Sequence, residues 1–503
     1  MTTELQNKQK FNIKNILTME NLLCFFIVIC PLLDAFSFLF RRYFNTSISI
    51  STFIRPIIPL IAIIYIFFKY KLKPQLLLAA LVYGVYAICH LYVFYKIKPG
   101  CSYGNEIREL QYLINYTYMA MNLFIYYYFF ARRNRDKEAE NELRKGKIIS
   151  KLKKSVLIAL TIYIALMYLA IITGTSSFTY EEDQMGLKGW FESGNSIGTI
   201  MLLCLFIVIP MMSKKNSTGI RIWSLMVIML TGVYLATLLG TRTGLLGIII
   251  VICAYVVINI VHSIIYSKNI NKKLVVFGSI VFVIILIAVT IFGSKTIERR
   301  KLLKDRQNLI YDQITGAPAH VTGDLVNIVE QIKNGTLSKD YMPEEMQKTI
   351  LELYDEANQK EISSTDMRTI QLIYHSHLIK NEKGISIALF GNGYMSHFYE
   401  LIFEMEVPAF LYNFGIVGFF LYCMPFIFIA IYGAYVLYKK VKNTSVEYAM
   451  YLMGLIFAII ISFVSGYTFF NSSSMMIIIV LTTLVINEIK DMEDAEMKIY
   501  ERK

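Results

Sequence analysis

Four short clusters in the chain contain residue types that could act on a phosphate or a sugar. In the first, residues 237–246, a Gly-rich turn places Arg242 among hydroxyl side chains. Arginine binds phosphate oxygens through two parallel hydrogen bonds, and the glycines let a phosphate approach the backbone closely. An arginine that only extends from the membrane boundary into water fits the same pattern. On the residues alone, the two interpretations carry about equal weight.

The second cluster joins Arg368 to Gln371 on a predicted helix, where an arginine is more often simply solvated. The third contains the turn Gly391-Asn-Gly393, whose glycines permit positive φ, and it is followed by His397. His397 is either a proton carrier or a hydrogen-bonded structural residue, and the structural use is favoured for a single histidine. Arg368 and His397 remain candidate site residues, although a solvated arginine and a structural histidine are the favoured interpretations.

The fourth cluster is Glu404-Met-Glu406, at the start of an apolar run. A carboxylate beside an apolar helix start is costly to desolvate unless it is paired or used. One of the two glutamates could therefore have a raised pKa and act as a general base. An ion pair with Lys or Arg at the membrane edge fits the pattern equally well.

The spacing of cysteines and histidines gives no sign of a metal site or of disulfides. The chain has seven cysteines and no CxxC pair, and only Cys101 lies outside the apolar stretches. His375 and His377 are two residues apart on a predicted helix and therefore point in different directions. We expect no metal, no other cofactor and no disulfide framework.

The composition predicts that a membrane-embedded helical bundle positions these clusters. Of the 503 residues, 55% are apolar and only 17% are charged, and the mean hydropathy is +0.50. A soluble domain carries about 25% charged residues, so an ordinary cytosolic enzyme and a disordered chain are excluded. We predict an all-α polytopic membrane protein with about 12 transmembrane helices. The apolar stretches are 21–40, 53–68, 75–95, 110–130, 155–173, 197–212, 222–239, 244–265, 274–293, 409–437, 447–465 and 472–487.

The basic residues predict how these helices are oriented. With the N-terminus inside, the inner segments hold 29 of the 50 Lys and Arg residues and the short outer loops hold 8, Arg55 among them. This is the positive-inside pattern, so we expect a multi-pass protein of the cell (plasma) membrane with cytoplasmic N- and C-termini. The net charge of +13 is then explained by orientation and by contact with membrane lipids, and we expect no nucleic acid partner.

The segment 294–408, of about 115 residues, is predicted to fold as a helical extracytoplasmic loop domain. Helices are expected from Pro343 to Tyr354 and from the N-cap-like run 363–366 onward. The predicted parts of the chain are a cytoplasmic tail (1–20), helices 1–9 (21–293), the loop domain (294–408), helices 10–12 (409–488) and a second cytoplasmic tail (489–503).

Taken in order, the clusters resemble the O-antigen polymerase/ligase superfamily, which contains Wzy-type polymerases and O-antigen ligases. The matching pieces are Gly-Trp-Phe-x-Ser-Gly-Asn (189–195), Gly-Thr-Arg-Thr-Gly (240–244), Arg368, Leu-Phe-Gly-Asn-Gly (389–393), and Glu-x-Glu with Phe-Gly-Ile-Val-Gly (404–418). The helix count and the long late loop fit as well, and the resemblance covers residues 20–490.

The resemblance implies a metal-independent, multi-span glycosyltransferase whose donor is a glycan on undecaprenyl diphosphate. Polymerases pass that glycan to another lipid-linked repeat unit, and ligases pass it to a lipid A core. The resemblance assigns Arg242 and Arg368 to the diphosphate. We further expect Trp190 and Asn195, in the smaller outer loop of residues 174–196, to line the glycan path, because aromatic rings suit the faces of sugars.

One departure from the ligase pattern favours a polymerase. Ligases of the superfamily carry a His-Asn-like pair eleven residues before the Gly of a Gly-x-x-Gly motif, whereas Glu404 lies eleven residues before Gly415. The Glu-x-Glu arrangement resembles the Glu-x-Asp of Gram-positive relatives that make capsular or teichuronic-type cell-wall polymers. We expect Glu404 or Glu406 to accept the proton of the attacking sugar hydroxyl, with His397 as the alternative.

Two rival functions are consistent with a dozen helices. A ligase-like enzyme that attaches polymer to an acceptor differs only in the last step. A lipid-linked glycan flippase would not need the large outer domain and should place cations within its helices, which here contain almost none at their centres. The expected partners are an undecaprenyl-diphosphate-linked oligosaccharide, membrane lipids and a chain-length regulator.

Overall fold

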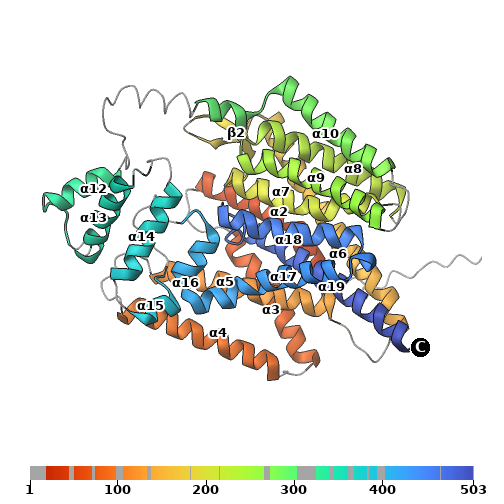
Figure 1. Ribbon diagram of the computed structural model, residues 1–503, viewed down its shortest axis with the longest axis horizontal. Helices are drawn as coiled ribbons and strands as arrows, with labels where there is room; N and C mark the ends of the chain where they lie inside the picture. The colour runs from red at the N-terminus through yellow and green to blue at the C-terminus, as the bar shows by residue number, and fades with distance from the viewer. Residues whose placement is uncertain are drawn as a thin grey trace, which may run out of the picture.

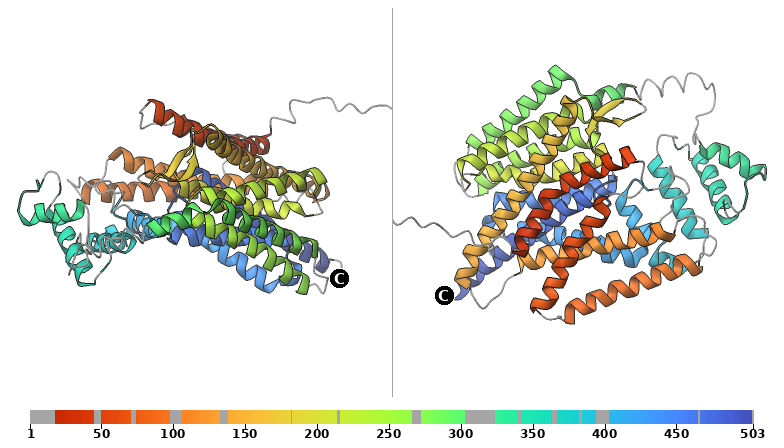
Figure 2. Two further views of the ribbon diagram at one scale, coloured as in Figure 1. Left: turned by 90° about the horizontal axis from the view of Figure 1, so that it is seen from above. Right: turned by 180° about the vertical axis from the view of Figure 1, so that it is seen from behind.

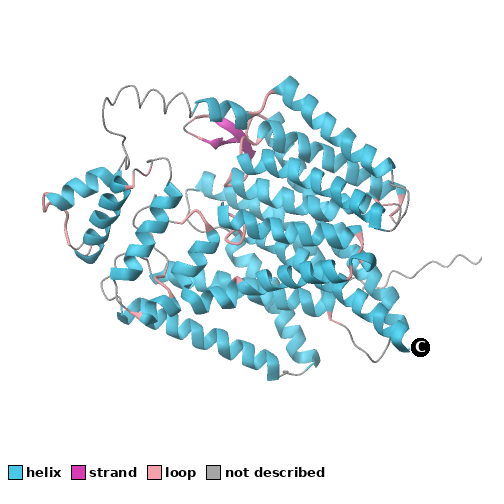
Figure 3. Cartoon of the chain, viewed as in Figure 1, coloured by secondary structure: helices cyan, strands magenta, loops and turns pink. Residues whose placement is uncertain are grey.

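A computed structural model describes most of the chain. The residues described are 18–44, 50–70, 74–97, 106–132, 138–181, 183–213, 216–265, 272–302, 324–339, 342, 344–360, 362, 367–381, 384–393, 403–464 and 466–501. Nearly all of them are helical, and the only sheet in this part of the chain is a two-stranded hairpin (Figures 1 and 3). The prediction of an all-α polytopic membrane protein is confirmed.

A bundle of long helices makes up most of the molecule. Its elements are α2 (Met19–Phe44), α3 (Ile50–Tyr70), α4 (Pro74–Tyr92) with η1 (Val93–Ile97), α5 (Glu106–Tyr126) with η2 (Tyr127–Ala131), α6 (Glu138–Ile172), α7 (Gly194–Val208) with η3 (Ile209–Met212), α8 (Thr218–Val233) with η4 (Tyr234–Leu238), α9 (Arg242–Ile265), α10 (Lys272–Phe292), α16 (Glu406–Tyr422), α17 (Met424–Lys439), η6 (Val441–Asn443), α18 (Val446–Val464) and α19 (Ser472–Glu501).

Each of the twelve predicted apolar stretches lies on helices of this bundle, because a chain that crosses a bilayer must satisfy its backbone internally. By length and composition, eight helices of the described chain can cross a membrane, or up to ten if each of two bent pairs counts as one. The predicted number of twelve is therefore not confirmed. The stretch 409–437 is also divided, because α16 and α17 are bent by 46° against each other.

The centre of the bundle is formed around α7. Every residue of α7 except Asn195 is buried, as expected for a helix that is apolar on all sides. The helix packs against α6, α9, α18 and α19. On the periphery, α4 and α10 leave large apolar side chains exposed, among them Ile88 and Ile287, which suits a surface that lies against lipid.

The two ends of the bundle differ. The hairpin of β1 (Ser177–Tyr180) and β2 (Met185–Gly189) lies at the same end as α12 (Asp324–Lys333), α13 (Glu344–Gln359) and α14 (Met367–Asn381), and the C-terminus lies at the opposite end (Figures 1 and 2). We call these ends the hairpin end and the C-terminal end.

The helices α12, α13 and α14, which we call the cap, have a hydrophobic core separate from that of the bundle. One face of α14 belongs to this core, since Ile370 and Tyr374 are buried in it. His377 on the same helix lies between two carboxylates of α13, with Nε2 2.6 Å from Glu356 and Nδ1 3.2 Å from Glu352. Helices in this region were therefore predicted correctly.

A glycine-lined turn joins the cap side of the molecule to the bundle. After α15 (Ile385–Phe390), Gly391 has φ +89° and lies against Gly415, which has φ +70° and interrupts α16. A Cβ atom on Gly391 would be 2.2 Å from the carbonyl oxygen of Asn413. The interruption leaves the carbonyl groups of Tyr412 and Asn413 to accept backbone hydrogen bonds from Asn392 and Gly393, both at 2.9 Å. The two glycine motifs are therefore one structural unit.

Candidate functional site

Arg368 and Glu404, predicted from different motifs, form an ion pair at the hairpin end. Arg368 is the second residue of α14, and Glu404 lies two residues before the start of α16. The Nε atom of Arg368 is 3.3 Å from Oε2 of Glu404, and the side chains are 45% and 55% exposed. A cation and a carboxylate thus meet where a ligand can reach both.

The main chain at Glu404 is held from two sides. The side-chain carbonyl of Gln371, on α14, accepts a hydrogen bond from the backbone N–H of Glu404 at 3.0 Å. On the other side Gly466 packs so closely that a Cβ there would be 2.5 Å from the carbonyl oxygen of Glu404. The backbone is fixed by these contacts, while the carboxylate remains accessible.

Glu406, only two residues further along, is completely buried and has a different environment. Its Oε1 atom accepts backbone hydrogen bonds from Thr468 at 2.6 Å and Phe470 at 2.9 Å, and Oε2 accepts one from Phe469 at 2.6 Å. These donors belong to the turn that precedes α19. The carboxylate of Glu406 therefore faces and holds that turn, whereas the carboxylate of Glu404 faces solvent and Arg368.

Arg242 begins α9 at the turn that follows η4. Gly240 adopts φ +82°, and the hydroxyl of Thr241 accepts a hydrogen bond from the backbone N–H of Gly244 at 3.1 Å, which is an N-cap bond. The turn is further held by Thr296, whose hydroxyl donates to the carbonyl of Thr241 at 3.2 Å. The Arg242 side chain is exposed and forms no hydrogen bond or ion pair with any residue that the structure describes.

The hairpin packs directly on the Arg242 turn. The hydroxyl of Thr179 donates to the carbonyl of Leu239 at 2.7 Å, and the hydroxyl of Tyr234 donates to the carbonyl of Leu187 at 2.6 Å. A Cβ on Gly186 would be 2.4 Å from the carbonyl oxygen of Leu239. The hairpin, which was not predicted from the sequence, therefore positions the arginine turn.

Trp190 and Asn195 lie in the segment that joins this hairpin to α7. Trp190 is half-buried and its indole N–H donates to the hydroxyl of Thr175 at 2.9 Å. Asn195 is the second residue of α7, just after the N-cap Ser193, and is also half-buried. Both residues thus belong with Arg242 to the hairpin side of the site.

Asp34 and Arg55 form a largely buried ion pair within the bundle. Arg55 lies inside α3 rather than in an outer loop, so the orientation count placed it wrongly. Its Nη2 atom is 2.5 Å from Oδ1 of Asp34 and donates to the hydroxyl of Ser473 at 3.0 Å. The hydroxyl of Tyr163 donates to Oδ2 of Asp34 at 2.7 Å. Side chains of neighbouring helices therefore satisfy the carboxylate of Asp34.

This network reaches two other segments of the chain. The ring of Tyr163 is 5.5 Å from that of Phe191, beside the hairpin, whereas Ser473 follows the turn that Glu406 holds. The Asp34–Arg55 network thus lies between the segment that follows the hairpin and the start of α19. The only sequence signal for this was the carboxylate in a predicted span.

His90 and Glu109 form a second buried pair that sequence reasoning missed. Both side chains are fully buried, with Nε2 of His90 2.6 Å from Oε1 of Glu109 and Nδ1 2.6 Å from the carbonyl oxygen of Phe390. A carbonyl can only accept, so Nδ1 carries a proton, and a second proton is shared between Nε2 and Glu109. The pair is electrically neutral as a unit. Through the bond from His90 to Phe390 it holds the start of the glycine-lined turn.

His397 falls outside the residues that the structure describes, so its position relative to Glu404 stays a prediction. Within the described ranges, no group of three or more His, Cys, Asp or Glu side chains is arranged to hold a metal ion. The groups that are in place, exposed cations beside an accessible carboxylate, can bind an anion and accept a proton.

Comparison with known proteins gives one match. A family model described as "O-antigen ligase like membrane protein" matches residues 17–492, which is nearly the whole chain. No curated protein and no solved structure matches the chain.

Proposed function

Because the chain belongs to the family of O-antigen ligase-like membrane proteins, we propose that it is the polymerase of a cell-surface polysaccharide. The family implies a membrane enzyme that processes lipid-linked polysaccharides. The proposed reaction transfers an undecaprenyl-diphosphate-linked glycan onto another lipid-linked repeat unit, at the membrane face where the hairpin end lies. The termini are then cytoplasmic, and the enzyme uses no metal.

The observation that carries the proposal is the accessible Arg368–Glu404 pair. When the donor binds, its diphosphate competes with Glu404 for the guanidinium of Arg368, and the carboxylate is released to act as a base. The acceptor hydroxyl oxygen then bonds to the anomeric carbon while the bond from that carbon to the diphosphate oxygen breaks. The hydroxyl proton goes to Glu404, and the electron pair leaves with the diphosphate, whose charge Arg368 stabilises.

Arg242 is proposed as the second cation for the diphosphate. Its side chain is exposed and, among described residues, unengaged, and its turn is rigidly held by the hairpin. Trp190 and Asn195, on the same side, are proposed to guide the glycan. Glu406 is proposed to position the site rather than to accept the proton, because its oxygens already hold three backbone N–H groups.

The test is to incubate the purified protein with a lipid-linked repeat unit and separate the products by size. A ladder of products supports a polymerase, a single transfer to a distinct acceptor indicates a ligase, and absence of any glycosidic product overturns the proposal in favour of a flippase. Arg368→Ala should abolish the ladder, whereas Lys380→Ala, also exposed on α14, should leave it intact.

A further inference from the structure

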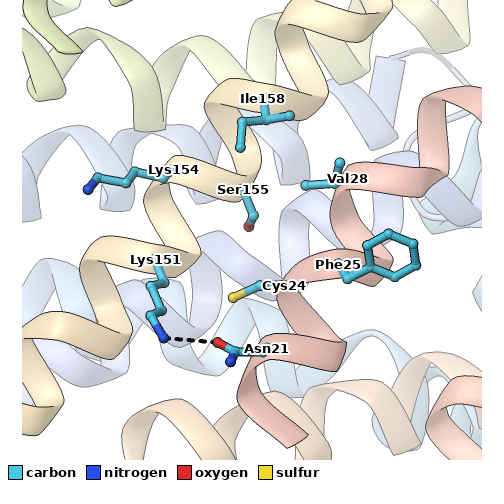
Figure 4. A pocket seen from close by; sticks show the side chains of 8 residues that line it. All are labelled: Asn21, Cys24, Phe25, Val28, Lys151, Lys154, Ser155 and Ile158. Carbon is cyan, nitrogen blue, oxygen red and sulfur yellow. Dashed lines mark hydrogen bonds between the residues drawn. The ribbon is translucent and has the colours of Figure 1, made fainter. Parts of the chain in front are cut away.

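A groove between α2 and α6 lies away from the candidate site (Figure 4). Its volume is about 250 Å³. It is lined by the first half of α2 and the middle of α6, whereas the candidate site lies beyond the other ends of these helices. Lys153, on the same part of α6, pairs with Glu447 at the start of α18, and the segment before α18 is in turn held to the end of α19 by the pair Lys440–Glu496. The groove therefore lies toward the C-terminal end.

On α6, the groove is lined by one face whose chemistry changes along the helix. Lys151, Lys154 and Ile158 follow at intervals of three and four residues, so they lie on the same side of the helix. Both lysines are exposed. The face therefore passes from cationic to apolar in the direction of the hairpin end.

On α2, the facing residues change in the same direction. Asn21, Phe25 and Val28 share one face, and the polar member again comes first. The side-chain oxygen of Asn21 accepts a hydrogen bond from Lys151 at 3.0 Å, which sets the polar residues of the two helices at one level (Figure 4). Phe25 is 55% exposed, so the apolar part of the groove is open to its surroundings.

The charge of the groove is positive. Lys153 is engaged by Glu447 and points elsewhere, but Lys151 and Lys154 are both at the groove. The nearest acidic side chain on α2 is Glu20, in the first turn, and it does not line the groove. Lys151 and Lys154 thus lie at one edge of the groove. They are at the level where α2 and α6 each begin their apolar run.

We propose that this groove binds an anionic glycerophospholipid of the membrane leaflet at the C-terminal end. The lysine ammonium groups hold the phosphate, and one acyl chain lies along Phe25, Val28 and Ile158. A soluble anion would satisfy the lysines but leave the apolar part uncovered, and a zwitterionic lipid would gain little from the lysines. Basic pockets between transmembrane helices select anionic head groups for this reason.

The test uses tryptophan fluorescence with the full-length protein in phosphatidylcholine vesicles that contain a minor fraction of brominated lipid. Phe25→Trp places an indole at the groove, and the emission of the unsubstituted protein, from Trp190 and Trp223, is subtracted. Brominated phosphatidylglycerol should quench this indole more than brominated phosphatidylcholine at equal fraction. The preference should be roughly fivefold for each contributing lysine.

The lysines are tested by adding Lys151→Gln and Lys154→Gln, which should remove the preference. The matched control is Lys439→Gln with Lys442→Gln, which removes the same charge at the end of α17 and should leave the preference unchanged. Equal quenching by both lipids, or a preference that survives loss of the groove lysines, would overturn the proposal. Thermal unfolding of each variant verifies that the fold is retained.

Discussion

At the scale of single residues, the pair Arg368–Glu404 contributes little to the stability of the fold. Both side chains are about half exposed, and an exposed ion pair contributes less than about 1 kcal/mol to folding. The neighbouring Glu406 is in the opposite situation, since it is buried and holds a turn of the backbone. The two glutamates should therefore respond differently to the same substitutions.

For the proposed base, we expect Glu404→Gln to lower the rate of polymer formation by about 10²–10⁴-fold, because an amide cannot accept the proton. Arg368→Lys should also lower it, since an ammonium lacks the planar fork that binds two phosphate oxygens. Product ladders from purified protein measure both effects. Unchanged ladders with Glu404→Gln would reassign the base to another group.

For the buried partner, Glu406→Ala should lower the free energy of unfolding by roughly 3–5 kcal/mol, because three buried N–H groups lose their acceptor. Glu404→Ala, two residues away, should change it by less than about 1 kcal/mol. Thermal or denaturant unfolding in detergent measures the difference. Equal destabilisation by the two substitutions would contradict the structural role of Glu406.

The sequence could not separate these two residues. Both precede the same apolar run, and the donors that distinguish them lie 62 to 64 positions later in the chain. For the same reason the pairs Asp34–Arg55 and His90–Glu109 were not predicted. The choice of a partner depends on which helices become neighbours, and neither spacing nor composition specifies that.

At the scale of elements, the glycine-lined turn is held between α16 and the His90–Glu109 pair. The carbonyl of Phe390 accepts a hydrogen bond from His90. The backbone N–H groups of Asn392 and Gly393 donate hydrogen bonds to carbonyl groups in the interrupted part of α16. Because only residues 394–403 separate the turn from Glu404 in the sequence, we expect its position to affect the candidate site.

We expect Glu109→Gln to preserve polymer formation, because a neutral His90 can still donate from Nδ1 to Phe390 and accept an amide N–H at Nε2. His90→Phe removes both bonds and should lower the turnover number much more than it raises KM for the lipid-linked substrate. Steady-state kinetics on the purified variants separates the two parameters. Loss of activity in a folded Glu109→Gln protein would show that the acid itself is required.

The cap should respond to acid through Glu356. Hydrogen bonds from Lys360 and then from His377 lower the pKa of Glu356 from its ordinary value of 4.5. A lowered pKa in the folded state means that the carboxylate stabilises the cap above its ordinary pKa. That contribution is lost as the pH falls through the lowered value. The surrounding charged groups are Glu352, Lys360 and His377.

Hydrogen-exchange protection factors of α13 and α14, corrected for the intrinsic pH dependence, should therefore decrease below about pH 4.5. The effect is small, less than about 1 kcal/mol, because the side chain of Glu356 remains partly exposed to solvent, which screens its charge. Glu356→Gln should show weaker protection at neutral pH and a smaller change with acid. Lys348→Gln, on the exposed side of α13, should behave as the unsubstituted protein does.

At the scale of the whole molecule, the distribution of basic residues predicts the hairpin end outside and the C-terminal end inside. We expect a fluorescent protein fused after Lys503 to be bright, and a C-terminal alkaline phosphatase fusion to be inactive, because that enzyme requires an oxidising, extracytoplasmic location. An active phosphatase fusion would reverse the proposed orientation and remove Arg242 and Arg368 from the outer face.

The overall architecture was predictable because membrane crossing imposes long apolar runs, and all of the predicted runs lie on bundle helices. The number of crossings is not confirmed, since only eight helices of the described chain, or up to ten if each bent pair counts as one, have the length and composition to cross a membrane. The hairpin was also missed, because its strands have only four and five residues. Short elements that are stabilised by packing against other parts of the chain have little sequence pattern of their own.

The bond between Glu406 and the turn before α19 has a consequence for biogenesis. While the ribosome is still making the chain, Glu406 emerges more than sixty residues ahead of its donors. A nascent chain that ends before Thr468 lacks the three N–H groups that bind this carboxylate. The surroundings of Glu406 can therefore form only after residues 468–470 have been translated.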